Sequence, residues 1–283
     1  MLLVQLTDLH VRPRGLAAYR MLETNMLTER AFRAVRALDA RGMRPDAVVI
    51  SGDLTENGLV AEYQQLAEML DRTLGHLPVY VVPGNHDRRE VLRAELSHLP
   101  GIEGCDGFIQ FVIEDHALRL VMLDTVVPGA GHGILCTDRL AWLDATLAQE
   151  PERPTVIVMH HPPILCGIRH MDAINLRDAD AFASVIERHR QVRRILCGHH
   201  HRPITGQVAH AIVSVAPSVA HQVELDLNVD DPGAWNFEPP AFHIHLTADD
   251  GGLATHTAYV ENFPGPFPFV TDPDYPGKPA SSA

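Results

Sequence analysis

Carboxylate, amide and imidazole side chains follow five short, mostly apolar runs of this sequence. Each run is three to five residues long, which is typical of a strand buried on both faces. Polar groups at such strand exits meet at the edge of the sheet where open α/β folds bind their ligands. The five strings are Asp8-Leu9-His10, Gly52-Asp53, Gly84-Asn85-His86-Asp87, His160-His161-Pro162-Pro163 and Gly198-His199-His200-His201.

Asp53 is the residue around which these groups are organised. The run Ala47–Ile50 leads into Ser51 and Gly52, and a glycine there allows a tight backbone exit and the close approach of another group. Asp8 and His10 are two residues apart, so in an extended chain they point to the same side. A carboxylate and an imidazole placed together are suitable ligands for a transition metal. Each string alone is weak evidence for a metal site, whereas the five strings together are strong evidence for one.

Histidine is unusually frequent, with 18 in 283 residues. Several of these histidines come directly after apolar runs, where a polar ring without a partner costs free energy. Metal coordination at these positions removes that cost. The competing interpretation, ordinary buried or surface histidines, does not account for their placement.

Composition argues against some classes of partner. The chain carries 23 basic and 36 acidic residues, a formal charge of −13. Nucleic acids and acidic membranes attract basic patches, so we expect neither as a partner. No apolar run approaches the ~20 residues of a membrane span, and Met1–Leu6 is too short for a signal peptide. The four cysteines are about 30 residues apart, which favours free thiols and a cytoplasmic protein.

The rest of the pattern predicts the surrounding elements. Buried strands are expected at Leu2–Leu6, Ala47–Ile50, Val79–Val82, Thr155–Met159 and Ile195–Cys197, with amphipathic helices between them. Antiparallel pairs are expected at Phe108–Ile113 with Leu118–Leu123, at Ile204–Val208 with Ala211–Val215, and at Ala241–Leu246 with Ala254–Val260. Residues 1–270 are predicted to form one domain, with 224–240 as an inserted loop and 271–283 as an irregular tail.

The five strings in this order resemble those of the calcineurin-like metallophosphoesterase superfamily, over residues 2–201 and beyond. Within it, the sequence is similar to the class III cyclic-nucleotide phosphodiesterases, especially their bacterial glycerophosphodiesterase branch. The resemblance implies an α/β (α+β) fold, a four-layer αββα sandwich of two mixed β-sheets flanked by helices. Further matching residues are Arg12-Pro13-Arg14-Gly15 with Tyr19, Arg44-Pro45-Asp46-Ala47-Val48-Val49, Met159-His160-His161-Pro162-Pro163, Met171-Asp172 and His221-Gln222-Val223.

The resemblance also implies two divalent transition metal ions with Asp53 as the carboxylate they share. The implied ligands are, for one ion, Asp8, His10, Asp53 and His201 and, for the other, Asp53, Asn85, His160 and His199. A pair of ions clamps the oxygens of a phosphoryl transfer and generates a bridging hydroxide near neutral pH. The mixed oxygen and nitrogen ligands admit Mn, Fe, Co or Zn.

His86 and Asp53 are the implied catalytic residues. His86 would act as a hydrogen-bond donor or general acid at the leaving-group oxygen or the phosphate. The resemblance implies that Asn85, His86 and His221 contact the substrate. Asp87 would either cap the following helix, the role we favour because short acids at turns commonly cap, or hold His86.

His161 and His200 are expected to pack around the ligands without binding the ions. In relatives the middle of the last string is often asparagine, so His200 departs from the family pattern at a position that is not a ligand.

The expected function is hydrolysis of a small-molecule phosphodiester, with cyclic nucleotides and glycerophosphodiesters as the leading substrates. Two alternatives stay open: a non-catalytic scaffold on the same fold, and a nuclease of the same superfamily. The acidic composition argues against the nuclease. By resemblance, residues 224–240 form a cap or an oligomer contact with Trp235 and Phe237 as candidate buried anchors, in a homodimer or a higher homo-oligomer.

Overall fold

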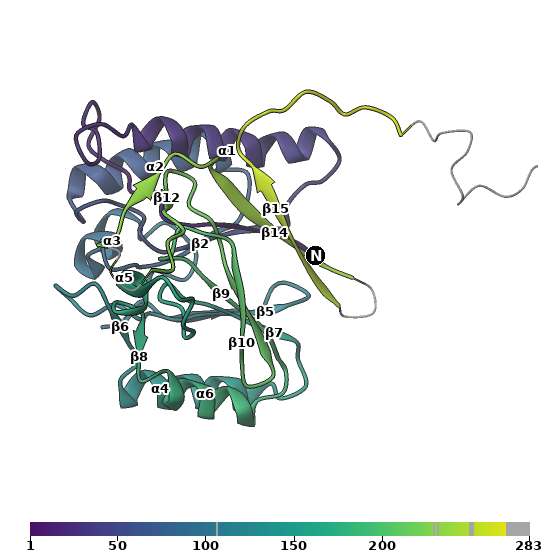
Figure 1. Ribbon diagram of the computed structural model, residues 1–283. Coiled ribbons are helices and arrows are strands. Elements are labelled where there is room, and N and C mark those ends of the chain that lie inside the picture. Colours follow the sequence, from purple (N-terminus) through teal and green to yellow (C-terminus); the bar gives the residue numbers. More distant parts are fainter. Residues whose placement is uncertain (106, 229, 231, 249–251, 270–283) are drawn as a thin grey trace, which may run out of the picture.

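The computed structural model describes residues 1–105, 107–228, 230, 232–248 and 252–269 (Figure 1). Two sheets form its centre. The five-stranded sheet has the order β15 (Leu253–Tyr259), β14 (Ala241–Thr247), β1 (Leu2–Leu6), β2 (Ala47–Ser51) and β3 (Val79–Val82). The six-stranded sheet has the order β10 (Ile204–Val208), β11 (Ala211–Val215), β9 (Val192–Cys197), β7 (Thr155–Val158), β5 (Arg119–Met122) and β4 (Phe111–Ile113).

Both sheets are mixed, as the family resemblance implies. In the first, β1, β2 and β3 are parallel, whereas β14 and β15 are antiparallel. In the second, β5, β7, β9 and β11 are parallel, and the edge strands β4 and β10 are antiparallel. The parallel strands therefore end on the same side of their sheets, where their following loops can meet.

Strands β1, β2, β3 and β7 are mostly apolar because the centre of each sheet is covered on both faces. Leu3, Val49 and Val82 of the first sheet pack in one cluster with Leu120 and Val158 of the second. The opposite face of each sheet packs against helices, which closes a four-layer sandwich. This confirms the predicted fold class.

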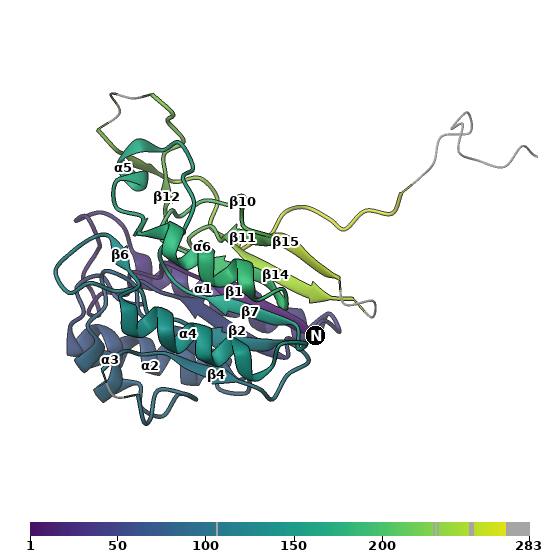
Figure 2. The same cartoon turned by 90° about the horizontal axis from the view of Figure 1, so that it is seen from below.

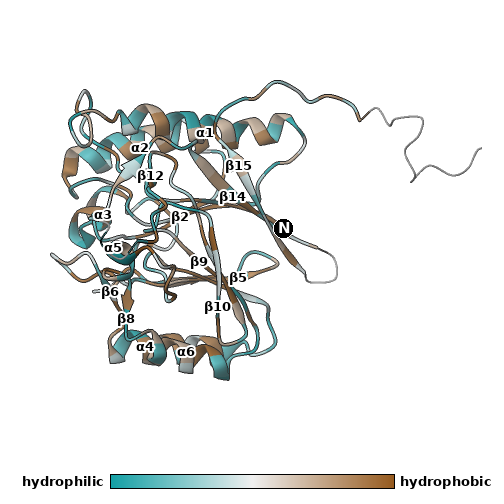
Figure 3. Ribbon diagram, in the orientation of Figure 1, coloured by the Kyte–Doolittle hydropathy of each residue, from teal (hydrophilic) through white to brown (hydrophobic). Residues whose placement is uncertain are grey.

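The helices supply the outer layers. Figure 1 shows α1 (Thr24–Ala40) and α2 (Val60–Leu74) on one side of the sandwich, with α4 (Thr137–Gln149) and α6 (Ala179–Arg188) on the other. Their apolar faces point inward and their polar faces outward (Figure 3). The short helices α3 (Arg89–Glu95) and α5 (Arg169–Asp172) lie in connecting segments. No helix in the described part of the chain combines the length and apolar composition that crossing a membrane requires.

Two expectations need adjustment. The first strand of the pair around residue 115 begins at Phe111 rather than Phe108, because the Ile109 amide donates to the Asp124 carboxylate instead of a neighbouring strand. The inserted segment 224–240 contains β13 (Trp235–Asn236), which pairs with β12 (Gln222–Val223).

The two-stranded sheet of β6 (Gly133–Ile134) and β8 (Leu176–Arg177) completes the elements. The predicted tail, 271–283, lies outside the described residues.

A buried pair of histidines between the sheets makes stability sensitive to acid. His243 and His245 of β14 are 4% and 1% exposed, and Arg194 of β9 lies near them. Burial, with a contribution from Arg194, lowers the pKa of His243 from 6.5 to about 4. The unfolded chain therefore binds a proton at His243 that the folded chain does not bind until the pH is much lower.

Neutral His243 contributes to the free energy of unfolding above about pH 6.5. We expect this contribution to be lost as the pH falls toward about 4. At about pH 5 this loss amounts to about 2 kcal/mol. Urea unfolding at about pH 7.5 and pH 5 measures it, and His243→Phe should lose less stability over that interval than the parent chain. An equal loss in both proteins would contradict the assignment.

Candidate metal centre

The strand exits adopt an unusual backbone conformation. Residues with positive φ in the described chain include five of the predicted ligands, namely Asp8 (53°), His10 (47°), Asp53 (48°), His199 (71°) and His201 (50°). Asp and His tolerate this left-handed region better than most residues, and strained conformations cluster at functional sites. Strands β1, β2 and β9 thus turn sharply at their ends and present polar side chains to their neighbours.

Hydrogen bonds between the exits hold these turns together. The Asp8 amide donates to the Gly52 carbonyl at 3.1 Å and the His10 amide to the Asp53 carbonyl at 3.0 Å, which ties the exits of β1 and β2. The His199 amide donates to the Asp8 carboxylate at 3.0 Å, which brings in the exit of β9 from the second sheet. The three loops therefore form one rigid platform.

The glycines beside Asp53 are required by close approach. Gly52 has a φ of 99°, and a Cβ there would collide with the imidazole of His160. A Cβ at Gly84 would collide with the side chain and backbone of Asp53. The expected tight exit and close approach at Gly52 are confirmed.

One group of predicted ligands converges around Asp8. The four side chains of Asp8, His10, Asp53 and His201 are buried, and their candidate ligand atoms all lie within 4.8 Å of one another. The His201 Nε2 atom is 3.2 Å from Asp8 Oδ1, and His10 Nε2 is 3.7 Å from Asp53 Oδ2.

A second group converges on the other side of Asp53. The His160 Nε2 atom lies 3.4 Å from Asp53 Oδ2 and 3.1 Å from Asn85 Oδ1. The ring of His199 is 5.1 Å from that of His160, centroid to centroid. Asp53 Oδ2 is therefore close to a histidine of each group, and the structure brings all seven predicted ligands to one place.

Each of these four histidines uses one ring nitrogen to donate to an oxygen. His10 Nδ1 donates to Glu56 Oε2 at 2.8 Å, and the other three donate to backbone carbonyls. These are His160 Nδ1 to Ser51 at 2.8 Å, His201 Nδ1 to His221 at 2.9 Å and His199 Nε2 to Ile174 at 3.0 Å. In a neutral imidazole the remaining nitrogen then carries a lone pair. An oxygen acceptor behind each ring is the usual arrangement for metal-binding histidines.

The free nitrogens of His10 and His201 face each other. Their Nε2 atoms are 3.2 Å apart, and both Nδ1 atoms are already donors. Two lone pairs this close repel unless a cation or a proton lies between them. Buried nitrogen and carboxylate ligands suit a divalent transition metal, so the donor set fits such ions.

The charges of the site are balanced internally. Burial raises the pKa of Asp53, but the imidazoles of His160 and His86 outweigh it and hold that pKa well below its ordinary value. Burial likewise lowers the pKa of His160, yet the Asp53 carboxylate raises it to about 9. A proton on His160 thus provides positive charge beside Asp53 at neutral pH, where a metal ion can replace it.

Comparison with known proteins places the chain in a family. The sequence model of the calcineurin-like phosphoesterases matches residues 1–203. The chain belongs to this family. It is 34% identical over 273 residues to a probable glycerophosphodiester phosphodiesterase of Arcobacter nitrofigilis, over 96% of this chain and 98% of that one. It is 35% identical over 253 residues to a probable cyclic nucleotide phosphodiesterase of Rhodopseudomonas palustris, over 87% and 88% of the two chains.

Solved structures share the fold at low identity. The purple acid phosphatase from yellow lupin (Lupinus luteus) seeds matches with a TM-score of 0.68 and 13% identity, over 92% of this chain and 51% of that one.

His86 and His221 of this phosphoesterase line a cleft that the predicted ligands His10, Asp53 and Asn85 also line. The His86 amide donates to Asp53 Oδ1 at 2.9 Å and its Nδ1 donates to the Glu56 carbonyl at 2.7 Å. Burial lowers the pKa of His86, but the Asp53 carboxylate raises it above the ordinary value. The ring of His221 packs 4.5 Å from that of His201, and its Nδ1 has no hydrogen-bond partner among the described residues.

Asp87 takes neither of the roles expected for it. Helix α3 begins at Arg89 without a side-chain cap, so the favoured capping role is wrong. The Asp87 carboxylate instead accepts hydrogen bonds from the amides of Leu54, Thr55 and Gly84 and from the hydroxyls of Thr55 and Tyr63. Burial, with a contribution from Asp53, raises its pKa to about 6. Asp87 thus clamps the loop after β2 to the loop that carries Asn85.

His161 lies against two predicted ligands, with its ring centroid 4.8 Å from that of His160 and 4.6 Å from that of His199, and it makes hydrogen bonds of its own. Its Nδ1 contacts the Thr125 hydroxyl at 2.7 Å and its Nε2 contacts the Gly131 carbonyl at 3.2 Å. Both ring nitrogens of His161 therefore have partners in the structure. The ligand atoms of His160, His161 and His199 nevertheless lie within 4.8 Å of one another, so the packing role of His161 stays a prediction.

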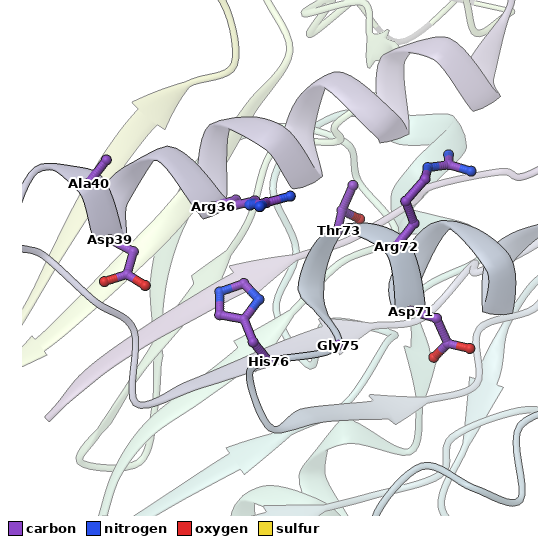
Figure 4. A pocket seen from close by; sticks show the side chains of 8 residues that line it. All are labelled: Arg36, Asp39, Ala40, Asp71, Arg72, Thr73, Gly75 and His76. Carbon is purple, nitrogen blue, oxygen red and sulfur yellow. The ribbon is translucent and has the colours of Figure 1, made fainter.

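A hollow at the C-terminal ends of α1 and α2 is unrelated to this centre (Figure 4). None of the predicted ligands lines it. Two of its charged groups form ion pairs with residues nearby, Arg72 with Glu29 at 3.1 Å and Asp39 with Arg44 at 3.7 Å. We assign it no catalytic role.

Glu56 is a residue of the centre that the sequence reasoning missed. Its carboxylate accepts a hydrogen bond from the His10 imidazole, and its backbone carbonyl accepts one from the His86 imidazole. We expect Glu56→Gln to weaken binding of the ion at His10 about 10–100-fold, because a carboxylate behind a ligand imidazole fixes its orientation and raises its basicity. Metal titration against a competing chelator measures this. Glu68→Gln, at an exposed position on α2, is the control, and equal affinities in the two variants would contradict the role.

Proposed function

We propose that this phosphoesterase is a phosphodiesterase that hydrolyses a small phosphodiester with two divalent metal ions. The observation that carries the proposal is a set of four histidines, each with one ring nitrogen donating to an oxygen. The second ring nitrogens of His10 and His160 lie 3.7 Å and 3.4 Å from the Asp53 carboxylate, and that of His201 lies 3.2 Å from Asp8. Such a donor set holds metal ions, and a pair of ions that share a carboxylate serves phosphoryl transfer.

Each ion would be held by four side chains, with Asp53 common to both. The proposed sets are Asp8, His10, Asp53 and His201 for one ion, and Asp53, Asn85, His160 and His199 for the other. When bound, divalent ions supply Lewis-acid activation of water and neutralise charge on phosphoryl oxygens. The ligand atoms admit Mn, Fe, Co or Zn.

The chain's own residues orient the phosphodiester and move the proton. The raised pKa of His86 keeps its imidazole protonated closer to neutral pH, so it can donate a hydrogen bond to the phosphate or a proton to the leaving alcohol. Its Nδ1 is occupied by the Glu56 carbonyl, so Nε2 is the atom that would donate. His221, whose ring lies 5.3 Å from that of His10 and 4.5 Å from that of His201, would also contact the phosphate.

The cleft fits a small substrate. It measures about 300 Å³, and its lining joins predicted ligands to two aromatic rings, Tyr19 and Trp235. These rings are stacked with centroids 5.3 Å apart, and Tyr19 also contacts His221 edge-on. Glycerophosphodiesters and 3′,5′-cyclic nucleotides, the substrate classes named for the relatives, are the two classes that we propose.

A turnover panel tests this function. The metal-reconstituted protein is assayed with cyclic nucleotides, glycerophosphodiesters, an aryl phosphodiester and an aryl phosphomonoester. We expect diesters to be cleaved fastest and activity to vanish with a chelator. Asn85→Ala and His199→Ala should lose diester turnover while their circular dichroism stays unchanged. Absence of turnover with every metal would favour a non-catalytic scaffold, and faster cleavage of single-stranded DNA would favour a nuclease.

We propose that segment 224–240 caps the cleft and that the protein forms a homodimer or larger homo-oligomer. Trp235, next to the cleft, supports the capping role. Phe237 contacts Trp235 with ring centroids 5.1 Å apart, yet it is 63% exposed in the isolated chain, so it is not a buried anchor there. A partner chain would cover it. Light scattering of the parent chain and of Phe237→Ser tests this, and a monomeric parent would contradict it.

We also propose a reducing, cytoplasmic environment. In the described part of the chain, Cys136, Cys166 and Cys197 take part in no disulfide. Free cysteines persist where glutathione and thioredoxin keep thiols reduced.

A further inference from the structure

A cysteine, an aspartate and a histidine come together outside the lining of the cleft. Cys166 lies in the segment after β7, Asp172 ends α5, and His200 lies between two predicted ligands in the loop after β9. Figures 1 and 2 place α5 near β12, on the side of the molecule away from the N-terminus. The three candidate ligand atoms all lie within 4.8 Å of one another.

Asp172 is held firmly in this group. Its Oδ1 accepts the Cys166 amide at 2.8 Å, and its Oδ2 accepts the Gly167 amide at 2.9 Å. The Cys166 Sγ atom lies 3.3 Å from Asp172 Oδ1. The carboxylate and the thiol are therefore fixed side by side by backbone hydrogen bonds.

His200 points into the group and has no partner of its own. Its side chain is fully buried, and neither ring nitrogen has a hydrogen-bond partner among the described residues. The neighbouring ligand histidines and His161 all have partners for at least one nitrogen. A buried imidazole without any partner costs free energy, and a ligand at this position would remove that cost.

We propose that Cys166, Asp172 and His200 form a third metal site, which holds a single zinc-class ion. Sulfur, nitrogen and carboxylate oxygen are the ligands that Zn²⁺ takes, and three protein ligands with one open position is a common arrangement. Bond lengths of about 2.0–2.3 Å in a tetrahedron place ligand atoms about 3.4 Å apart. The Sγ to Oδ1 distance of 3.3 Å already meets this.

The thiolate distinguishes this site from the dinuclear centre. On binding, the Cys166 thiol releases its proton to solvent, and the sulfur, the carboxylate and the neutral imidazole surround the ion. Thiolate ligands select Zn²⁺ over Mg²⁺ or Mn²⁺. Cys166 is only partly buried, so the ion has a route from solvent.

Such an ion would connect two walls of the cleft. The segment that carries Cys166 and Asp172 also provides Met171 and Ile174 to the cleft lining, and the Ile174 carbonyl accepts from His199. A bond from this segment to His200 would hold it against the ligand loop. The third site is thus independent of the proposed catalytic ions but placed to stabilise their surroundings.

Titration of the metal-free full-length protein with Co²⁺ tests the proposal. Cobalt bound to a thiolate produces a charge-transfer absorption band in the near ultraviolet, whereas the dinuclear ligand set contains no sulfur. We expect the wild-type protein to show this band with one equivalent more cobalt than Cys166→Ser binds. Cys166→Ser and His200→Asn should lose the band, and Cys136→Ser, at another partly buried cysteine, should keep it.

A wild-type protein without the band would overturn the third site, as would a band that persists in Cys166→Ser. Neither result bears on diester turnover, so this failure is distinct from that of the proposed function. Alkylation of Cys166 in the unmutated chain is the second measurement. Added Zn²⁺ should slow it, and an unchanged rate would also contradict the proposal.

Discussion

Asp53→Ala should remove two metal ions from each chain rather than one. The reason is that Asp53 Oδ2 lies 3.4 Å from His160 Nε2 and 3.7 Å from His10 Nε2, so one carboxylate faces both groups of ligands. Its loss leaves two sets of histidines without their shared anion. Hydrolysis of the diester should fall to background, because neither ion would be held where phosphoryl transfer needs it.

Elemental analysis of the reconstituted variants measures this effect. Asp8→Ala is the matched control, since Asp8 is also a buried carboxylate but belongs to only one group. It should lose one ion. Circular dichroism checks that both variants fold. Loss of a single ion from Asp53→Ala would show that Asp53 does not bridge, even if the protein remains a phosphodiesterase.

His86→Gln should lower kcat about 10²–10⁴-fold, the usual contribution of a positioned acid–base group. His86 lines the cleft and is not a proposed ligand, so the variant should bind its metal ions as the parent does. The effect should shrink with an aryl leaving group, because a more acidic alcohol needs less help from a proton donor.

Steady-state kinetics with a glycerophosphodiester and an aryl phosphodiester, together with metal analysis, separate the two contributions. His76→Gln is the control, at an exposed position after α2. If His86→Gln lost metal in proportion to activity, His86 would be supporting the ligands rather than the leaving group. An unchanged kcat would remove it from the mechanism.

The five strand exits were predictable because buried strands are recognisable in the sequence as short apolar runs. Strands β1, β2, β3, β7 and β9 are buried between layers, so each appears as a short apolar run with an abrupt polar end. Parallel strands end on one side of a sheet, which brings those polar ends together. The apolar runs therefore predicted buried strands with polar groups gathered at their ends, whereas the four-layer fold class was implied by the family resemblance.

The contacts behind these residues were not predictable in the same way. Glu56 meets His10 across 46 residues of sequence, and Asp87 meets the Thr55 amide across 32. Neither pair follows a helical or strand period, since both depend on how loops pack after the sheets form. His200 is a similar case, because only the structure shows Cys166 and Asp172 beside it.

The proposed pair of metal ions shares the Asp53 carboxylate as a ligand. Anomalous diffraction from crystals of the manganese-loaded protein tests it most directly. We expect two peaks about 3.5–4 Å apart, as is usual for two-metal phosphoryl-transfer sites, with the Asp53 carboxylate in contact with both. A single peak there, or two peaks of which only one touches Asp53, would contradict the claim.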